Sequence, residues 1–190
     1  MNARIELNLD KKTFLRWAQE QEGRYEWVDG KIFMQQSATR GHGNVAMRMA
    51  HEFILRLDLD LWNVLGADLA VDLGDQIRVP DVMVERVNAD NKALATDEPV
   101  VLVEVLSPSS IATDMNIKPP RYMALPSLEA YIVASQDEAR CWIWQRDIGK
   151  PDRPFPAEPV TISGPDAKLE VTALGVSVAL ADIYRGMFKS

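Results

Sequence analysis

The chain has 190 residues, of which 47% are hydrophobic and 26% charged, and its formal net charge is -7. This length suits one sizeable core, so a single domain over residues 1–190 is predicted. The acidic charge excludes an ordinary basic nucleic-acid-binding module but not a protein that first binds a divalent cation. The N-terminus is mixed and charged and the apolar runs are short, so we expect a cytoplasmic protein with no membrane partner.

The first 60 residues predict a helix, a β-hairpin and a longer helix. Residues 10–21 form an amphipathic pattern that begins at Asp10, a residue type that caps helix N-termini. Asp29 and Gly30 stand between two short alternating runs, which is typical of a two-residue hairpin turn. Apolar residues then recur at helical spacing over residues 42–59.

The rest of the chain predicts mostly strands, and together with the helices it indicates an α/β (α+β) fold. The first strand-like runs are residues 67–73, 76–85 and 99–107. The third of these is apolar on both faces, as expected of a covered central strand. A short helix entered through proline follows at 121–125. The later strand-like runs are residues 129–135, 139–147 and 169–180, with a proline-rich loop at 149–159.

Two carboxylates contradict their apolar surroundings. Glu104 lies inside the apolar run 100–106, where an ionised carboxylate is costly unless it is paired or bound to a cation. Asp81 has the same character in the preceding strand-like run. If the two strands pair, the carboxylates converge, and hard oxygen ligands suit magnesium or manganese. Alternatively, Glu104 pairs with a buried Arg or Lys and Asp81 caps a turn after Pro80. The residues alone leave both interpretations open.

Asp114, Lys118 and Tyr122 are spaced four residues apart, which would place them on one face of a helix. A lysine close to two carboxylates could orient a water molecule or stabilise charge on a phosphoryl oxygen. The alternative is an exposed ion pair between Asp114 and Lys118 on a surface turn.

Several segments along the chain form a combined signature. They are YEWVDGKI at 25–32, GADLAVD at 66–72, PDVMV at 80–84, LVEVLSPSS at 102–110, the Asp114, Lys118 and Tyr122 spacing, LPSLEAYIVASQDEAR at 125–140 and LGVSVALADIYRG at 174–186. Taken together, they resemble the Uma-two family, a branch of the PD-(D/E)XK nuclease superfamily. The resemblance covers nearly the whole chain, and its most specific part is a PD strand that precedes VEVLSPS.

The resemblance implies a restriction endonuclease-like fold, in which helices flank a central mixed sheet beside an N-terminal helix and hairpin. It also implies a magnesium- or manganese-dependent endonuclease, with DNA as the expected nucleic acid. Asp81 and Glu104 match the acidic residues that hold the catalytic metal, and Glu26 matches an acid that reaches the site from the N-terminal region. Lys118 matches a lysine that the family supplies from the following helix, because Leu106 occupies the usual position of the superfamily lysine.

The same resemblance gives Asp114 and Tyr122 a supporting role, in which they hold the catalytic lysine. Pro119 and Pro120 depart from the family pattern. Because a residue before proline is disfavoured in helical geometry, we expect Lys118 to precede the helix rather than to lie within it.

The remaining candidates for reactive side chains are few. Cys141 is the single cysteine and lies in a strand-like run, so it is predicted to be a core residue. His42 and His51 are nine residues apart on a predicted helix and do not face one another, which argues against a two-histidine metal site.

The sequence therefore predicts a metal-dependent endonuclease, and two alternatives stay open. One is a nuclease-fold protein with a degraded site that binds nucleic acid or protein. The other is a structural domain in which Glu104 is salt-bridged and no metal enters. The sequence leaves open the choice of DNA or RNA, and a homodimer is compatible with the apolar late strands.

Overall fold

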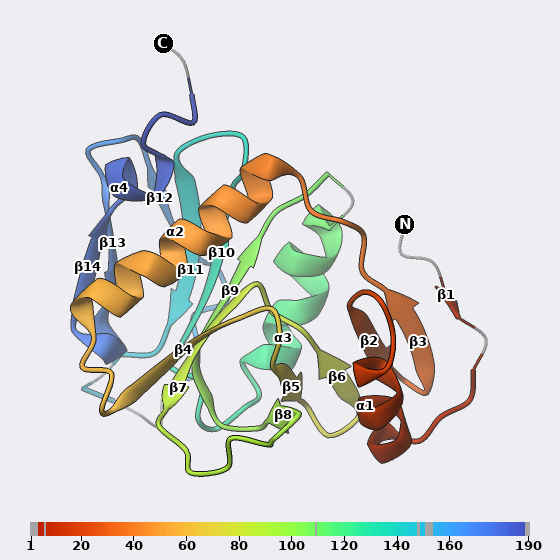
Figure 1. Cartoon of the computed structure of the whole chain (residues 1–190). Helices are drawn as coiled ribbons and strands as arrows, with labels where there is room; N and C mark the ends of the chain where they lie inside the picture. Colours follow the sequence, from red (N-terminus) through yellow and green to blue (C-terminus); the bar gives the residue numbers. More distant parts are fainter. Residues whose placement is uncertain (1–3, 6, 109, 148, 151–153, 189–190) are drawn as a thin grey trace.

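The computed structural model describes residues 4–5, 7–108, 110–147, 149–150 and 154–188. It places a central sheet between two layers of helices, beside a second sheet from the N-terminal half (Figure 1). Within the described ranges, none of the helices combines the length and hydrophobicity that crossing a lipid bilayer requires.

The central sheet has six strands, and its middle strand β9 is the apolar run expected from the sequence. β9 pairs parallel with β10 and antiparallel with β7, so the sheet is mixed. In order across the sheet, the strands are β12 (Val160–Ser163), β11 (Arg140–Gln145), β10 (Ala130–Ala134), β9 (Pro99–Val105), β7 (Val82–Arg86) and β4 (Trp62–Gly66).

The two faces of β9 contact different layers because successive side chains of a strand point to opposite faces. Val103 and its odd-numbered neighbours pack into the core beneath α2, whereas Leu102 packs against Tyr122 on the other face. Glu104 has the same parity as Leu102 and therefore faces the α3 side. The elements of the first layer are α2 (Arg40–Arg56), β13 (Lys168–Val171), β14 (Val176–Ala179) and α4 (Leu180–Tyr184), and those of the second are η1 (Thr113–Ile117) and α3 (Lys118–Tyr122).

The second sheet is built mainly from the N-terminal hairpin and the segment before the central sheet. The hairpin turn at Asp29 and Gly30 is confirmed, and both residues have the positive φ, 49° and 77°, that a tight hairpin requires. The helix cap at Asp10 is also confirmed, because its carboxylate accepts a hydrogen bond from the Thr13 backbone N–H at 3.0 Å. The helix that this cap begins is α1 (Lys11–Gln19). In order across the second sheet, the strands are β1 (Arg4–Ile5), β3 (Lys31–Met34), β2 (Tyr25–Val28), β6 (Gln76–Arg78), β5 (Ala70–Asp72) and β8 (Ala95–Thr96).

The segment 76–85 crosses from one sheet to the other, so its prediction as one continuous strand is wrong. β6 pairs with β2 and β5 in the second sheet, whereas β7 pairs with β4 and β9 in the central sheet. Pro80 lies at the break and has no N–H to donate to a ladder. The Asp81 backbone N–H then joins the central sheet by donating to the Val103 carbonyl at 3.1 Å. Asp81 therefore marks the junction of the two sheets.

The C-terminal strands differ from the expectation, and one strand of the central sheet has no signal in the sequence. The late run 169–180 was expected to supply edge strands, but β13 and β14 form a separate two-stranded sheet with the 3-10 turn η2 (Thr172–Leu174) between them. The sequence patterns also do not predict β4, whose residues are only partly buried. In the loop 149–159, residues 151–153 lie outside the described residues.

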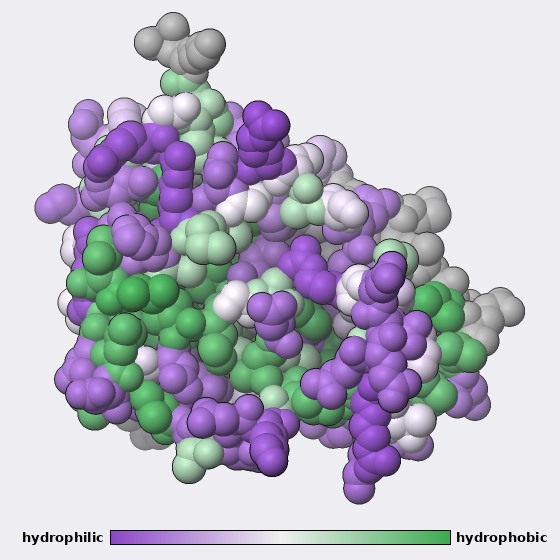
Figure 2. All heavy atoms as spheres, in the orientation of Figure 1, coloured by the Kyte–Doolittle hydropathy of each residue, from purple (hydrophilic) through white to green (hydrophobic). Residues whose placement is uncertain are grey.

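Apolar side chains are exposed around the C-terminal end of α2 and the segment that leads to β4, where Figure 2 shows a green area. They are Ile54, Leu55, Leu59 and Leu61. The homodimer that the sequence allows stays a prediction.

Candidate active site

Glu104 is buried and hydrogen-bonded on the α3 side of β9. Lys118 Nζ donates to its Oε1 at 2.7 Å, and the Tyr122 hydroxyl donates to the same oxygen at 3.0 Å. Strand pairing sets Glu104 opposite Val133 of β10, so the carboxylate lies in the covered middle of the sheet. Among the described hydrogen bonds, none falls on Oε2 of Glu104.

Lys118 lies among three carboxylates. Besides Glu104, its Nζ is 3.0 Å from Asp114 Oδ1 and 3.9 Å from Glu26 Oε1. The approach to Asp114 is an ion pair without hydrogen-bond alignment, because this oxygen has no hydrogen-bond partner in the described structure. Both side chains are buried, with 7% and 2% exposed, so the alternative of an exposed surface pair is wrong.

The two prolines after Lys118 do not remove it from the helix. A π-turn, η1, runs directly into α3, and the Lys118 backbone N–H donates to the Thr113 carbonyl. Lys118 has helical φ and ψ, and Pro119 and Pro120 follow it at the start of α3 without ending the helical run. The expectation that Lys118 precedes the helix is therefore wrong. The wide turn lets Lys118, Asp114 and Tyr122 face Glu104 together.

Glu26 reaches the cluster from β2, but its firmest partner is an arginine that the sequence analysis did not single out. Arg78 on β6 donates to Oε2 of Glu26 at 2.8 Å and to the Gln76 side chain at 3.0 Å. The Gln35 amide and the Val79 backbone N–H donate to Oε1 of Glu26, at 3.2 Å and 3.4 Å. Glu26 is thus positioned beside Lys118 by the second sheet.

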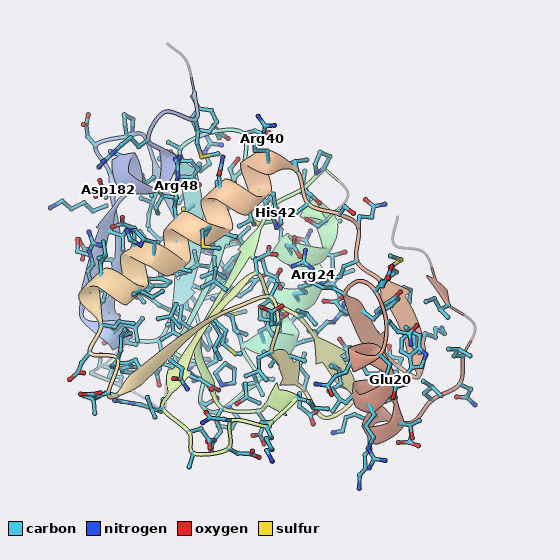
Figure 3. All side chains as sticks on the ribbon, viewed as in Figure 1. Glu20, Arg24, Arg40, His42, Arg48 and Asp182 are labelled. Carbon is cyan, nitrogen blue, oxygen red and sulfur yellow. The ribbon has the colours of Figure 1, made fainter. Side chains whose placement is uncertain are left out.

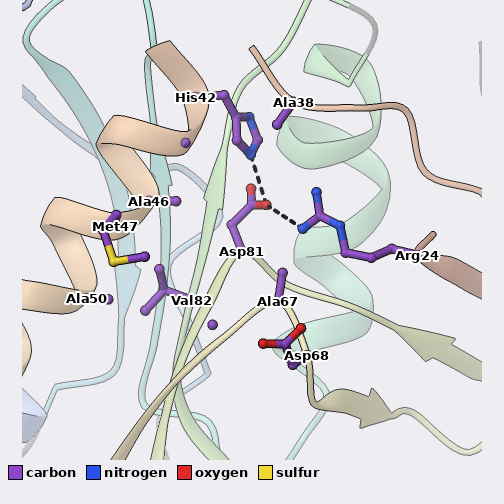
Figure 4. Close-up of a pocket in the computed structure, with 12 residues that line it drawn as sticks. Arg24, Ala38, His42, Ala46, Met47, Ala50, Ala67, Asp68, Asp81 and Val82 are labelled. Atoms are coloured by element: carbon purple, nitrogen blue, oxygen red, sulfur yellow. Dashed lines mark hydrogen bonds and ion pairs between the residues drawn. The ribbon is translucent and has the colours of Figure 1, made fainter. Parts of the chain in front are cut away.

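Asp81 is held from two sides at the end of β7. The Val105 backbone N–H donates to Oδ2 at 2.8 Å, and His42 Nε2 lies 2.9 Å from Oδ1. Since a carboxylate oxygen only accepts, Nε2 carries the hydrogen in this pair. Arg24 approaches Oδ1 at 3.8 Å. Figure 4 shows Arg24 and His42 pointing toward Asp81, and Figure 3 shows His42 on α2 and Arg24 on the β2 side.

His42 and Arg24 are site residues that the sequence analysis missed. Their contact with Asp81 joins positions far apart in the chain, and neither residue stands out from its local pattern. His51 is exposed on α2, which agrees with the argument against a two-histidine site. Cys141 is buried, as predicted for a core residue.

The pKa shifts around Lys118 follow from burial and from three carboxylates that face two buried cations, Lys118 and Arg78. Burial raises the pKa of Glu104 well above its usual value, and the charges of Asp114 and Asp81 raise it further against the opposing effect of Lys118. Burial would lower the pKa of Lys118, but Glu104, Glu26 and Asp114 raise it well above its usual value. Negative charge on Glu104 is therefore less favourable here than in water, and positive charge on Lys118 is more favourable.

Asp81 shows the opposite shift. Burial would raise its pKa, but the hydrogen bond and charge of His42 and the Val105 backbone N–H lower it below its usual value. Asp81 is therefore ionised at neutral pH. The site therefore joins a carboxylate whose pKa is lowered, Asp81, to one whose pKa is raised, Glu104.

The donor set fits magnesium or manganese bound by Asp81 and Glu104. These oxygen ligands suit hard cations, and the local excess of negative charge would be neutralised by a divalent ion. Within the described residues, no group of three or more His, Cys, Asp or Glu side chains could hold a metal ion. Magnesium is commonly bound through one or two carboxylates together with waters and substrate phosphate, so two carboxylates are sufficient.

Comparisons with known proteins agree with this architecture. The Uma2 family, whose description is "Putative restriction endonuclease", matches residues 12–179. The chain is 26% identical to uncharacterized protein slr1290 of Synechocystis sp. (strain ATCC 27184 / PCC 6803 / Kazusa) over 182 residues, 94% of this chain and 93% of that protein. It is 24% identical to uncharacterized protein sll1609 of the same organism over 128 residues, 65% of this chain and 72% of that protein.

A solved structure has the same fold. The crystal structure of a putative nuclease belonging to DUF820 from Anabaena variabilis ATCC 29413 superposes with a TM-score of 0.71 and 16% sequence identity, covering 92% of this chain and 98% of that chain. At this identity the likeness concerns the fold. The mixed α+β, restriction endonuclease-like fold expected from the sequence is thereby confirmed.

Proposed function

This chain belongs to the Uma2 family, and from that premise we propose that it hydrolyses phosphodiester bonds of nucleic acid with the help of a divalent cation. DNA is the expected substrate. The observation that carries the proposal is the meeting of Asp81, Glu104 and the buried Lys118 where the two sheets join. Around Lys118 the arrangement is not a set of one-to-one ion pairs, because three carboxylates, Glu26, Glu104 and Asp114, face two buried cations, Lys118 and Arg78.

Asp81 and Glu104 would hold Mg²⁺ or Mn²⁺. A cation bound there would lower the pKa of a water molecule and neutralise charge on the phosphate. The Val105 N–H and His42 fix the orientation of Asp81. Tyr122 and Lys118 fix one oxygen of Glu104 and leave its other oxygen free of described hydrogen bonds.

Lys118 would act through its charge. Its raised pKa keeps the ammonium protonated at neutral pH, which rules it out as a general base. An ammonium has three N–H donors, and one of them is used by Glu104. The others would donate to the attacking water or to a phosphoryl oxygen, where preorganised positive charge stabilises the transition state. Asp114 also holds the ammonium, at 3.0 Å from Nζ.

A second candidate function is binding of nucleic acid or protein without cleavage. The observation that favours it is the close engagement of Lys118 by Glu104 and Asp114, which a substrate would have to loosen. This candidate shares the fold and the metal site with the first and differs from it in turnover.

A cleavage assay separates the two candidates. Labelled single- and double-stranded DNA and RNA would be incubated with the wild-type protein and Mg²⁺ or Mn²⁺. We expect metal-dependent cleavage that falls at least about 100-fold in Asp81→Ala, since a group that binds the cation contributes several kcal/mol to transition-state stabilisation. The matched control is Asp60→Ala, which removes an exposed carboxylate in the loop after α2.

Full metal-dependent activity in Asp81→Ala would remove the hydrolase proposal. Binding of a substrate by the wild type without turnover of any of the four would favour the non-catalytic candidate.

A further inference from the structure

A pocket of ≈ 360 Å³ opens beside Asp81, between α2 and the end of β4 (Figure 4). At roughly 30 Å³ per water molecule, it has room for about a dozen waters, more than the hydration of one cation needs. A volume of this size lies within the range of small-molecule sites. The pocket therefore has space for a part of the substrate as well as for the metal.

The walls of the pocket are mostly apolar and many of their residues are small, although Met47, Val82 and the carboxylate of Asp68 also line it. Gly43, Ala46 and Ala50 line it from α2, three to four residues apart and therefore on one helix face. Gly66 and Ala67 line it from the opposite side. The small side chains create the hollow, because larger residues at these positions would fill it.

Three polar side chains of the pocket, Asp81, Arg24 and His42, lie together, and Asp68 lines it beside Ala67. Arg24 has 34% of its side chain exposed and approaches Asp81 only to 3.8 Å, so it is free to turn toward a ligand. Its planar guanidinium matches the geometry of a phosphate group. The pocket thus offers an anion partner beside the metal-binding carboxylate and an apolar hollow beyond it.

We infer that this pocket binds one unpaired nucleoside next to the scissile phosphate, with Arg24 on a backbone phosphate, and that the substrate is single-stranded or locally unpaired nucleic acid. The inference rests on the proposed function. In a polynucleotide, the group adjoining a phosphodiester is a nucleoside, whose base has apolar faces. A base in a duplex is paired and stacked, and it enters a concave pocket only after extrusion, at a cost of a few kcal/mol.

The charge of the whole protein supports the same choice. A duplex binder gains most of its affinity from many contacts between basic residues and phosphates. A chain with a net charge of -7 lacks that general attraction and depends on a local site.

Binding measurements test the inference without requiring cleavage. Fluorescence anisotropy would follow a short labelled oligonucleotide of mixed sequence, as a single strand and as a duplex, in DNA and in RNA form, with Ca²⁺ in place of Mg²⁺. We expect the wild type to bind at least one of the two single strands roughly tenfold or more tighter than the corresponding duplex, because a base must be extruded from the duplex before it can enter the pocket.

Glycines on opposite walls allow the pocket to be filled without disturbing the core. A Cβ added at Gly43 or Gly66 meets no atom within 4 Å, and neither residue has a positive φ. Gly43→Leu and Gly66→Leu should each weaken single-strand binding roughly tenfold, because the added side chain occupies space that the apolar face of the base would otherwise bury. Gly43→Ala, the matched control for helix propensity, should bind nearly as the wild type does. Arg24→Gln should reduce the slope of log affinity against log salt by about 0.7, the value for one phosphate on a single strand.

Equal affinity for single strand and duplex, no binding of either single strand, or wild-type binding by both leucine variants would overturn the inference. Failure of this inference can be distinguished from failure of the proposed hydrolase function. Cleavage of duplex and single strand alike, unchanged in the leucine variants, would remove the inference and keep the hydrolase. The expected binding pattern without any cleavage would keep the inference and remove the hydrolase.

Discussion

The surroundings of Lys118 and of Asp81 meet at one site but differ in how closed they are. Lys118 is enclosed by three carboxylates and has 7% of its side chain exposed, whereas Asp81 borders an open pocket with Arg24 at its mouth. The closed part joins both sheets through Glu26 and Glu104, so it contributes to the fold as well as to the site. The open part is where a ligand has room to enter. Stability and binding should therefore respond differently to changes in the two parts.

The largest expected effect on stability comes from removal of the central cation. Lys118→Met leaves buried carboxylates without their partner, and breaking a buried pair costs about 3–5 kcal/mol of the free energy of unfolding. Urea unfolding followed by tryptophan fluorescence measures the loss. Arg121→Met is the control, because Arg121 lies on the same helix in an exposed pair with Asp75 and should cost at most about 1 kcal/mol. Similar losses in the two variants would contradict the assignment of a closed, stabilising cluster.

A second expectation concerns the pH dependence of the closed part. Burial would raise the pKa of Glu26, but Lys118 and Arg78 lower it below the ordinary 4.5. Its contribution to stability is therefore present above pH 4.5 and is lost as the pH falls through the lowered pKa. Glu26→Gln should destabilise the fold by about 3 kcal/mol at pH 7. The destabilisation should become progressively smaller as the pH falls below 4.5. Urea unfolding of both proteins over this pH range checks it, and a difference that does not change with pH would count against the expectation.

The open part should affect function more than folding. His42→Ala removes the group that orients Asp81, and loss of such a partner typically reduces metal affinity or activity by roughly 10–100-fold. His42→Gln retains an N–H donor and should recover part of the loss. His51→Ala, an exposed histidine on the same helix, is the control. Manganese affinity measured in all three variants decides the matter, and equal affinity in His42→Ala and His51→Ala would exclude the orienting role.

The smallest effect is expected from the proline pair. Pro120 is exposed and lies in the first turn of α3, so Pro120→Ala loses only the restriction that proline places on the unfolded chain, about 1 kcal/mol or less. Metal binding should be unchanged. A loss as large as that of Lys118→Met, measured in the same unfolding assay, would show that the prolines are needed to position the lysine.

Local physical chemistry accounts for the parts of the fold that the sequence predicts. The Asp10 cap, the Asp29-Gly30 turn and the doubly covered β9 each follow from a few adjacent residues. The division of residues 76–85 between two sheets does not, because strand periodicity says nothing about which partner a strand will pair with. Pro80 was the local signal for that break.

The candidate site divides in the same way. Glu104 is recognisable because a carboxylate in an apolar run conflicts with its surroundings, and the spacing of Lys118 relates it to Asp114 and Tyr122. Arg78 and His42 gave no such signal, since their partners lie 52 and 39 residues away in the chain. Tertiary structure was needed to find them.

The most direct test of the metal site is a calorimetric titration of Mn²⁺ into the wild type, Asp81→Ala and Asp60→Ala. We predict saturable binding to the wild type and to Asp60→Ala, and loss of that binding in Asp81→Ala. Binding to Asp81→Ala with wild-type affinity, or no binding to the wild type, would contradict the assignment of Asp81 and Glu104 as the metal-binding carboxylates.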